Sequence, residues 1–210
     1  MGEIIDDLEC CFEAQEELTE RWHLKAGDME AEYESIMSSV SGKSLACVIA
    51  AQHFMNYSLW HVEDTARRRD VQADVIADCK HRIDVLNQKR NNLIEKIDEA
   101  VTSAMSASLP PDALEKYNTE TLGMAIDRMS IIALKIYHMR EQTSRGDVDQ
   151  WHRDRCAAKL SELTEQRERL KQSIFDLADD YLAGRKSIKP YYQHKMYNDR
   201  NLNPELYGKP

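Results

Sequence analysis

No proline precedes Pro110 in this 210-residue chain, and the whole chain has only seven glycines. Turns recruit glycine and proline, so a β-rich or α/β domain of this length would need many more of both. Hydrophobic residues make up 42% of the chain but aromatic residues only 7%, which is typical of the aliphatic cores of helical bundles. The composition therefore predicts an all-α protein built from long helices.

The spacing of the apolar residues predicts five helical segments. We expect them over residues 3–40, 44–69, 70–105, 120–143 and 148–183. Gly27 should break the first segment, and Asp28 and Asp70 should cap the restart of that segment and the third one. Apolar residues recur every 3.5 positions in the third and fifth segments, which predicts an antiparallel helical bundle.

The chain also contains an internal repeat. Residues 45–101 align with residues 122–178 without a gap, and eleven of the 57 pairs are identical. The identical pairs include His61 with His138, Cys79 with Cys156 and Arg90 with Arg167. Two unrelated amphipathic hairpins could share leucines for generic reasons, but shared histidine, cysteine and arginine favour a duplication. The prediction is a duplicated helical hairpin of four long helices, with an N-terminal helix packed alongside.

A basic tail follows the predicted bundle. We expect one helical domain over residues 1–183, and residues 184–210 form a segment with six Lys or Arg, two acids and four tyrosines. Bases interleaved with aromatic residues can mark single-stranded nucleic-acid binding. The chain as a whole carries a formal net charge of -9, which argues against a nucleic-acid partner. The tail is therefore predicted to dock on the acidic bundle.

The cysteines and the hydropathy indicate in which cellular compartment the protein is found. Five cysteines without a C-x-x-C spacing predict reduced thiols, with neither a disulfide framework nor a zinc knuckle. No apolar run approaches the ~20 residues that cross a bilayer, and the N-terminus lacks the positive region of a signal peptide. We expect a cytoplasmic protein with no membrane insertion.

A polar stripe on the second predicted helix marks the candidate site. His53, Asn56, Trp60, Glu63 and Arg67 follow one another at spacings of three or four residues, so they share one helix face. The neighbouring stripe is apolar, which places these polar side chains at the edge of the core. Buried polar groups need partners.

Charged residues of the other helices can supply those partners. Arg90 and Arg167 occupy core positions of the heptads, and Asp127, Arg128 and Lys135 interrupt a very apolar helix. Ionised groups are rarely buried without a reason, since desolvation is costly. Two interpretations remain open: an ion network that fixes helix register, and a polar pocket in which arginines hold the phosphate or carboxylate of a small molecule. In both, the two heptad arginines should lie inside the bundle, within reach of a carboxylate or an anion.

Motifs for catalysis or metal binding are sparse. The chain has no Glu-x-x-His pair of the kind that di-iron bundles use, so we predict no metal and no cofactor. His53, Glu63 or Asp64 could act as an acid–base group, but no nucleophile motif and no glycine-rich phosphate loop accompanies them. Whether the protein is an enzyme stays open.

Four stretches of the sequence resemble a known family. They are residues 56–67 (NYSLWHVEDTAR), 83–98 (IDVLNQKRNNLIEKID), 119–139 (TETLGMAIDRMSIIALKIYHM) and 191–199 (YYQHKMYND). Together they resemble a bacterial domain-of-unknown-function family, number 4254, over most of residues 45–207. That family has no established activity, and its genes often lie beside glycosyltransferases of cell-surface polysaccharide synthesis, which implies an accessory role there.

Two classes of function follow from these observations. The first is a non-enzymatic binding or accessory protein, linked to surface-polysaccharide synthesis by the resemblance. The alternative is a small helical enzyme or ligand-binding protein that acts on a phosphorylated or carboxylated small molecule in the polar pocket. Long heptad helices also favour a protein partner or a homodimer.

Overall fold

The computed structural model describes residues 2–24, 29–40, 44–194, 196 and 199–207. These residues form helices and loops, with no strand among them. The helices are α1 (Gly2–Leu24), α2 (Met29–Val40), α3 (Leu45–Ala66), α4 (Ala73–Met105), the 3-10 helix η1 (Ser106–Ser108), α5 (Leu122–Thr143), α6 (Gln150–Leu182) and α7 (Pro204–Tyr207). The predicted all-α helical bundle is confirmed.

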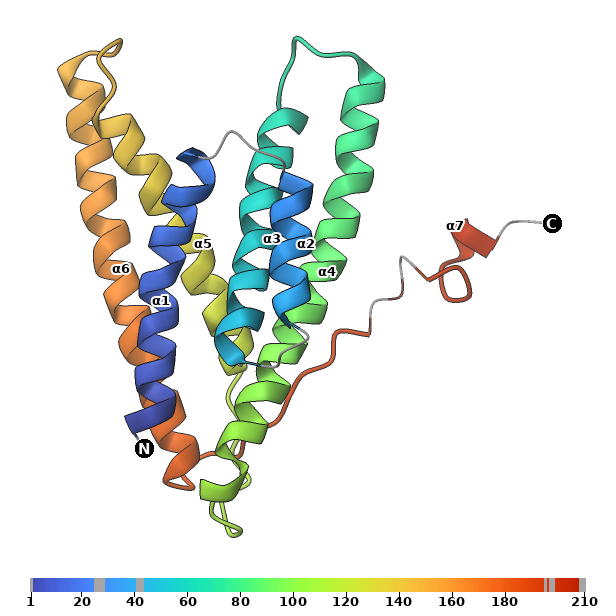
Figure 1. Ribbon diagram of the computed structural model, residues 1–210, viewed down its shortest axis with the longest axis vertical. Helices are drawn as coiled ribbons and strands as arrows, with labels where there is room; N and C mark the ends of the chain where they lie inside the picture. The colour runs from blue at the N-terminus through green and yellow to red at the C-terminus, as the bar shows by residue number, and fades with distance from the viewer. Residues whose placement is uncertain (1, 25–28, 41–43, 195, 197–198, 208–210) are drawn as a thin grey trace.

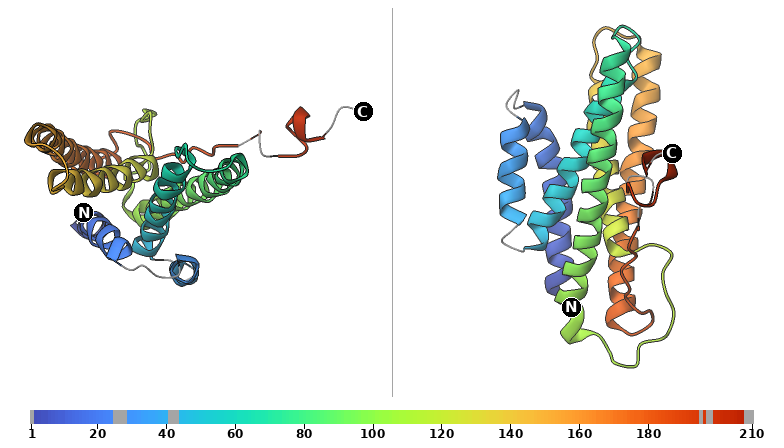
Figure 2. Two further views of the ribbon diagram at one scale, coloured as in Figure 1. Left: turned by 90° about the horizontal axis from the view of Figure 1, so that it is seen from above. Right: turned by 90° about the vertical axis from the view of Figure 1, so that its right-hand side faces the viewer.

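Two antiparallel hairpins make up most of the bundle (Figure 1). The helices α3 and α4 form the first hairpin, and α5 and α6 form the second. The first helices of the two hairpins contact each other and run in the same direction (Figure 1). Figure 2 shows α1 and α2 on one side of the hairpins, where α1 packs on α3 and α5 while α2 packs on α3. The helix α3 therefore has neighbours on several sides.

The two hairpins have matching boundaries. When the alignment of the repeat is continued to the last residue of each hairpin, the ends of α3 and α4 coincide with the ends of α5 and α6: Leu45 with Leu122, Ala66 with Thr143, Ala73 with Gln150 and Met105 with Leu182. The caps correspond as well, because the hydroxyls of Ser44 and Thr121 accept the backbone N–H three residues on, at 3.3 and 3.2 Å. These boundaries have the spacing of the predicted repeat. The duplication itself stays a prediction.

The predicted cap of the third helix is wrong. The helix α4 begins at Ala73 and follows Gln72, whose side chain makes no capping bond. The carboxylate of Asp70 instead accepts two N–H groups of Arg68, at 3.0 and 2.7 Å. An arginine two residues away outcompetes the backbone for this carboxylate, because paired charge-assisted bonds are stronger than a neutral cap. The predicted break and cap at residues 27 and 28 lie outside the described residues.

One apolar core joins the hairpins and the N-terminal helix α1. Leu8, Phe12 and Trp22 of α1 are buried with residues of α3 to α6. The Trp22 ring meets Phe54 edge-on, with ring centroids 5.0 Å apart, a geometry that adds to the stability gained from burial alone. Heptad positions such as Ile97 on α4 are buried as predicted. The helix α1 is thus part of the core.

The start of α5 is fixed against α4. A Cβ added at Gly123 would lie 2.6 Å from the carbonyl oxygen of Ile94, so no larger residue fits this close approach. The Gly123 N–H donates to the Asp98 carboxylate at 2.7 Å. That carboxyl is buried between the helices, and burial raises its pKa. A carboxylate at this position complements the positive end of the α5 dipole.

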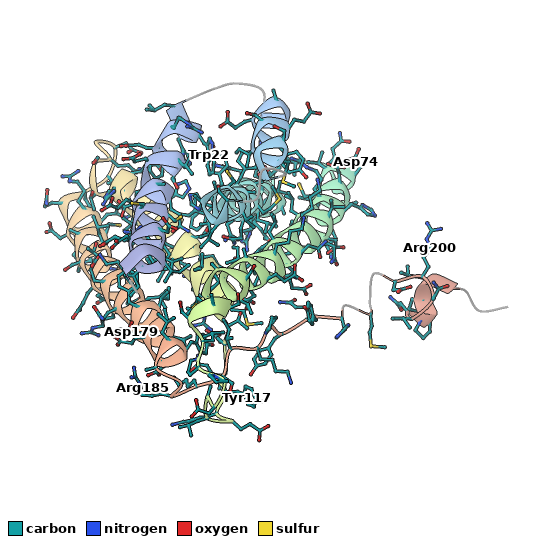
Figure 3. The ribbon with its side chains drawn as sticks, turned by 60° about the horizontal axis from the view of Figure 1, so that its bottom comes forward. Trp22, Asp74, Tyr117, Asp179, Arg185 and Arg200 are labelled. Atoms are coloured by element: carbon teal, nitrogen blue, oxygen red, sulfur yellow. The ribbon has the colours of Figure 1, made fainter. Side chains whose placement is uncertain are left out.

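The first part of the tail lies along the base of the bundle. Ser187 donates its N–H to Lys116 O at 2.9 Å, and the Tyr191 hydroxyl donates to Asn118 O at 2.8 Å. Figure 3 shows Arg185 at this end of the bundle, whereas Arg200 lies on the part of the tail that extends away from the helices. Within the described residues, none of the helices combines the length and the apolar character needed to span a bilayer.

Candidate functional site

The eleven residues predicted to share one polar pocket lie in four places. One group forms a buried network around α3 and α5, one residue lies beside α1, two residues line a groove, and the last group lies toward the surface. The buried network contains His53, Asn56, Arg90 and Asp127, and Arg167 is the residue beside α1. Trp60 and Lys135 line the groove, and Glu63, Asp64, Arg67 and Arg128 lie toward the surface. The structure does not bring them into a single cavity.

The centre of the network is the carboxylate of Asp127, which is only 7% exposed. It accepts one N–H from Gln52, one from Asn56 at 2.9 Å, and the Nε–H of Arg90 at 2.7 Å. A second N–H of the Arg90 guanidinium donates to its other oxygen, so the pair is bidentate. Charge-assisted bidentate pairs are among the strongest hydrogen bonds in proteins. This pair joins the two hairpins, because the arginine lies on α4 and the carboxylate on α5.

The network continues from Asn56 to α1 through a histidine. The amide of Asn56 donates to the Ser130 hydroxyl at 2.9 Å, and that oxygen lies 2.7 Å from Nδ1 of His53. On its other side Nε2 of His53 lies 2.8 Å from the carbonyl oxygen of Gln15 and 2.9 Å from the Thr19 hydroxyl. A carbonyl only accepts, so Nε2 carries the proton and Nδ1 accepts from the hydroxyl.

The histidine of this network is neutral at ordinary pH. The side chain of His53 is completely buried, and burial lowers its pKa from 6.5 to about 3. The positive charge of Arg167 lowers it further. A neutral imidazole with one donor and one acceptor matches the partners that surround it. The arrangement therefore holds α1, α3 and α5 in register, and it occupies both ring nitrogens of His53.

The second heptad arginine points to α1. The side chain of Arg167 is 9% exposed, lies 2.6 Å from the Glu16 carboxylate and donates to the carbonyl oxygen of Phe12 at 2.6 Å. Its counterpart Arg90 reaches a carboxylate on α5. The prediction that both arginines would reach a carboxylate between the helices is confirmed, although the sequence gives no sign that α1 provides one of the two.

Four predicted residues lie toward the surface. Arg67 pairs with Glu63 one turn earlier at 2.5 Å, and Arg128 pairs with Glu120. Asp64 is exposed. Exposed pairs of this kind contribute little to stability and leave no enclosed volume for a ligand.

A cleft of about 560 Å³ opens between α2, α3 and α4. We call it the first-hairpin cleft. Its floor is apolar and comes from α3, where Phe54, Met55 and Val62 are almost completely buried. Tyr33 of α2 and Leu86 of α4 face it from the two sides. A volume of this size is within the range of pockets that hold small organic molecules.

The edge of the first-hairpin cleft is basic. Lys89 and Arg82, both on α4, line it together with His81. The Lys89 ammonium lies 4.3 Å from the centroid of the Tyr33 ring, a cation–π contact. Arg82 approaches the carboxylate of Asp78 only to 3.9 Å. The cleft thus combines an apolar interior with cations at its rim.

The second hairpin carries a groove at the equivalent place. This second-hairpin groove has a volume of about 450 Å³, and all but one of its lining residues align, in the repeat, with a lining residue of the first-hairpin cleft. The exception is Trp60. The equivalent pairs are Ser58 with Lys135, His61 with His138, Val62 with Met139, Thr65 with Gln142, Arg82 with Lys159, Val85 with Glu162, Leu86 with Leu163 and Lys89 with Gln166. In the groove Gln166 stands where the cleft has Lys89, Lys135 stands where it has Ser58, and Glu162 adds an acid. Both linings therefore hold two cations, but only the groove holds an acid, so the first-hairpin cleft is the better anion site.

One group among the described residues could hold a metal ion. Ring nitrogens of His23, His61 and His138 lie within 4.8 Å of one another, one nitrogen from each ring. Burial lowers the pKa of His23 and of His61, which favours the neutral imidazole that a metal requires. Three separate helices supply these residues, so no sequence spacing could predict the group.

Sequence reasoning missed the contribution of α1. Gln15, Glu16 and Thr19 all bond to residues of the buried network or to Arg167. Gln15 and Thr19 lie one helical turn apart and are completely buried, so the available signal was a polar pair within the apolar face of an amphipathic helix.

Comparison with known proteins supports the resemblance seen in the sequence. Residues 46–190 match the family described as protein of unknown function (DUF4254). The chain belongs to this family. No match is found among curated proteins or among solved structures.

The DUF4254 match covers both hairpins, from the start of α3 to the end of α6. It therefore includes the Arg90–Asp127 pair and most of the lining of both clefts. The helices α1 and α2, which provide His23 and Tyr33, precede the matched region.

Proposed function

We propose that this protein is a non-enzymatic binding protein whose ligand is an organic anion with an apolar body, held in the first-hairpin cleft. The observation that supports this is the pairing of an apolar floor with two rim cations, Arg82 and Lys89, in a cleft of about 560 Å³. Apolar pockets with a few convergent polar groups are the usual form of small-molecule sites.

The floor and the rim have separate tasks in this proposal. Phe54, Met55 and Tyr57 offer an apolar and aromatic surface, and each CH₂ group that a ligand buries there gains about 0.8 kcal/mol. The ammonium of Lys89, on the Tyr33 ring, and the guanidinium of Arg82 attract the anionic group. The apolar contacts supply affinity, whereas the cations select for charge.

The buried network has a structural role in the same proposal. Asp127 already accepts bonds from three side chains, and His53 has a partner on both ring nitrogens. A phosphate there would displace Asp127 from Arg90 and leave a buried carboxylate without its counter-charge. We therefore place the anionic ligand in the cleft and not among the predicted pocket residues.

The natural ligand class follows from the accessory role that the family resemblance implies. Synthesis of surface polysaccharides uses phosphorylated sugars and lipid-linked phosphates, and the second of these combine an apolar body with an anion. A lipid phosphate is therefore the first natural ligand to test in the first-hairpin cleft.

The test compares an anionic with a neutral fluorescent probe. The anion is anilinonaphthalene sulfonate and the neutral analogue is N-phenylnaphthylamine, each titrated into the full chain, with farnesyl phosphate as a competitor. Replacing both rim cations (Arg82→Gln with Lys89→Gln) should weaken the anionic probe about tenfold, or about 1.4 kcal/mol, and leave the neutral probe unchanged. Equal loss for both probes would contradict a charge-selective rim.

A matched control removes the same charge elsewhere. Arg155 and Arg169 are exposed on α6, and replacing both with Gln should leave the affinity for the anionic probe as it is. If this pair weakens the probe as much as the rim pair does, the attraction comes from the net charge of the protein and not from the cleft.

A further inference from the structure

We propose that His23, His61 and His138 form a site for one Zn²⁺ ion between α1, α3 and α5. Each helix supplies one histidine, and one ring nitrogen of each lies within 4.8 Å of the others. Bonds of about 2.0–2.1 Å from zinc to nitrogen would bring these atoms to roughly 3.4 Å from one another. Binding would therefore draw the three nitrogens closer together. This site shares His61 with the lining of the first-hairpin cleft, but it does not require the proposed organic ligand.

All three rings present a nitrogen that lacks a partner. The Nε2 atoms of His23, His61 and His138 are buried and make no hydrogen bond to the described part of the chain. Buried polar atoms in proteins are nearly always paired. Three unpaired imidazole nitrogens from separate helices, in one cluster, are best explained by a common partner.

The hydrogen bonds on the opposite ring atoms fix two of the tautomers. Nδ1 of His23 lies 2.7 Å from the carbonyl oxygen of Thr19, and Nδ1 of His138 lies 2.7 Å from the Glu141 carboxylate. Both oxygens accept, so each Nδ1 carries the proton and each Nε2 presents a lone pair. Metal-binding histidines are held in this way, by a carbonyl or a carboxylate on the second nitrogen.

Aromatic side chains hold the rings in place. The Trp60 ring stacks on His138 with centroids 4.6 Å apart and planes 9° apart, and Tyr137 stacks on His23 at 4.1 Å. The ring of His61 meets Tyr57 edge-on at 4.5 Å. Ligands fixed by packing before the ion arrives lose little freedom on binding, which raises affinity.

The location of the site follows from the arrangement of the hairpins. His61 and His138 are an aligned pair of the repeat, on helices that run in the same direction (Figure 1). They therefore occupy equivalent positions of the two hairpins and face each other where α3 meets α5, with ring centroids 6.0 Å apart. The helix α1 adds the third ligand. Both paired histidines also line the clefts of their own hairpins.

Zinc is among the ions that fit this donor set. Neutral imidazoles suit Zn²⁺, Cu²⁺ and Ni²⁺, whereas Mg²⁺ and Ca²⁺ need oxygen ligands. Three protein ligands leave a fourth position for water or an exogenous anion. The structure thus assigns a three-histidine site with one exchangeable position.

The test measures metal content and affinity of the full-length chain. The purified protein is stripped with a chelator, loaded with Zn²⁺ and dialysed, and the zinc is then measured by mass spectrometry. Competition with a chromophoric chelator gives the affinity, and Co²⁺ gives a visible spectrum that reports the geometry. We expect one ion per chain with a four-coordinate cobalt spectrum. Less than one ion, or a six-coordinate spectrum, would overturn the proposal.

Matched variants locate the ion. His23→Ala and His138→Ala should each lower the affinity by more than about 100-fold, and Glu141→Gln by about tenfold. The control is His81→Ala, because that exposed histidine also bonds a carbonyl one turn earlier, at 2.9 Å, and should bind Zn²⁺ as the parent does. If His81→Ala lowers the affinity for Zn²⁺ as much as His23→Ala does, the assignment is refuted.

Two further measurements distinguish the histidine cluster from metal bound elsewhere on the chain. Zn²⁺ should raise the melting temperature of the parent but not of His23→Ala, provided that both show the same helical circular dichroism. A sulfur-to-cobalt charge-transfer band would place the ion on the cysteines and overturn the proposal. Failure of the zinc test leaves the binding of organic anions unaffected, since the two tests share neither probe nor variant.

Discussion

The carboxylate of Asp127 offers the sharpest test of what holds the two hairpins together. It accepts N–H groups from Gln52, from Asn56 at 2.9 Å and twice from Arg90, and its side chain is 7% exposed. Asp127→Asn keeps the shape but removes the charge and turns one acceptor into a donor. The substitution leaves the guanidinium of Arg90 without its counter-charge.

The expected loss follows from the burial of the pair. Breaking one partner of a fully buried ion pair costs about 3–5 kcal/mol, and the arginine here is 24% exposed, so water recovers part of that. We expect Asp127→Asn to lower the free energy of unfolding by about 3 kcal/mol. In a protein of this size that corresponds to a fall of about 6–12 °C in melting temperature.

The assay is urea unfolding at neutral pH, followed by far-ultraviolet circular dichroism. The matched control is Asp147→Asn, because Arg145 makes the same two-bond contact to that carboxylate at the surface, at 3.0 and 2.6 Å. The exposed pair should matter far less, since solvent screens it. A cycle with Arg90→Met should give a coupling energy of about 2 kcal/mol. If Asp127→Asn unfolds like its parent, the network does not join the hairpins energetically.

Two other substitutions test local features of the bundle. Gly123→Ala should lower the free energy of unfolding by about 2 kcal/mol, because a Cβ would lie 2.6 Å from Ile94 O and 2.9 Å from the Asp98 carboxylate. The control is Gly146→Ala, whose Cβ meets nothing within 4 Å. Equal losses of stability in the two variants would contradict the close approach at Gly123. The pKa of His53 falls from 6.5 to about 3 on folding, so the unfolded chain binds the extra proton between those values. The free energy of unfolding should therefore fall by about 1.4 kcal/mol per pH unit as the pH drops below 6.5. Urea unfolding of a His53→Gln variant across that range should lack this dependence on pH. If the variant keeps it, another group is responsible.

Much of the fold could be predicted because helix periodicity and caps are local. The boundaries of α5 and α6 fall within two residues of the ones that periodicity predicts. Thr121 and Asp149 cap these helices through their own side chains, although neither cap was predicted. The predicted cap at Asp70 is wrong, because Arg68 competes for the same carboxylate. Local sequence shows which residue can cap but not which partner it takes.

The candidate site was less predictable, because it depends on contacts between helices. The heptads place Arg90 and Arg167 among the helices, yet the partner of Arg167 is Glu16 on α1, near the opposite end of the chain. The cleft depends on Tyr33 of α2, and the three-histidine cluster on His23 of α1. The spacing of apolar residues along α1 and α2 predicts that they are helices, but it does not predict which helices they pack against.

An organic anion with an apolar body should bind in the first-hairpin cleft. The most direct test is the amide spectrum of the isotope-labelled chain, recorded by nuclear magnetic resonance during titration with farnesyl phosphate. We expect the largest shifts at Ser58, Val85 and Lys89, which line the cleft, and smaller shifts at Leu163 and Gln166 of the equivalent groove. Shifts confined to the groove or to the basic tail would contradict it.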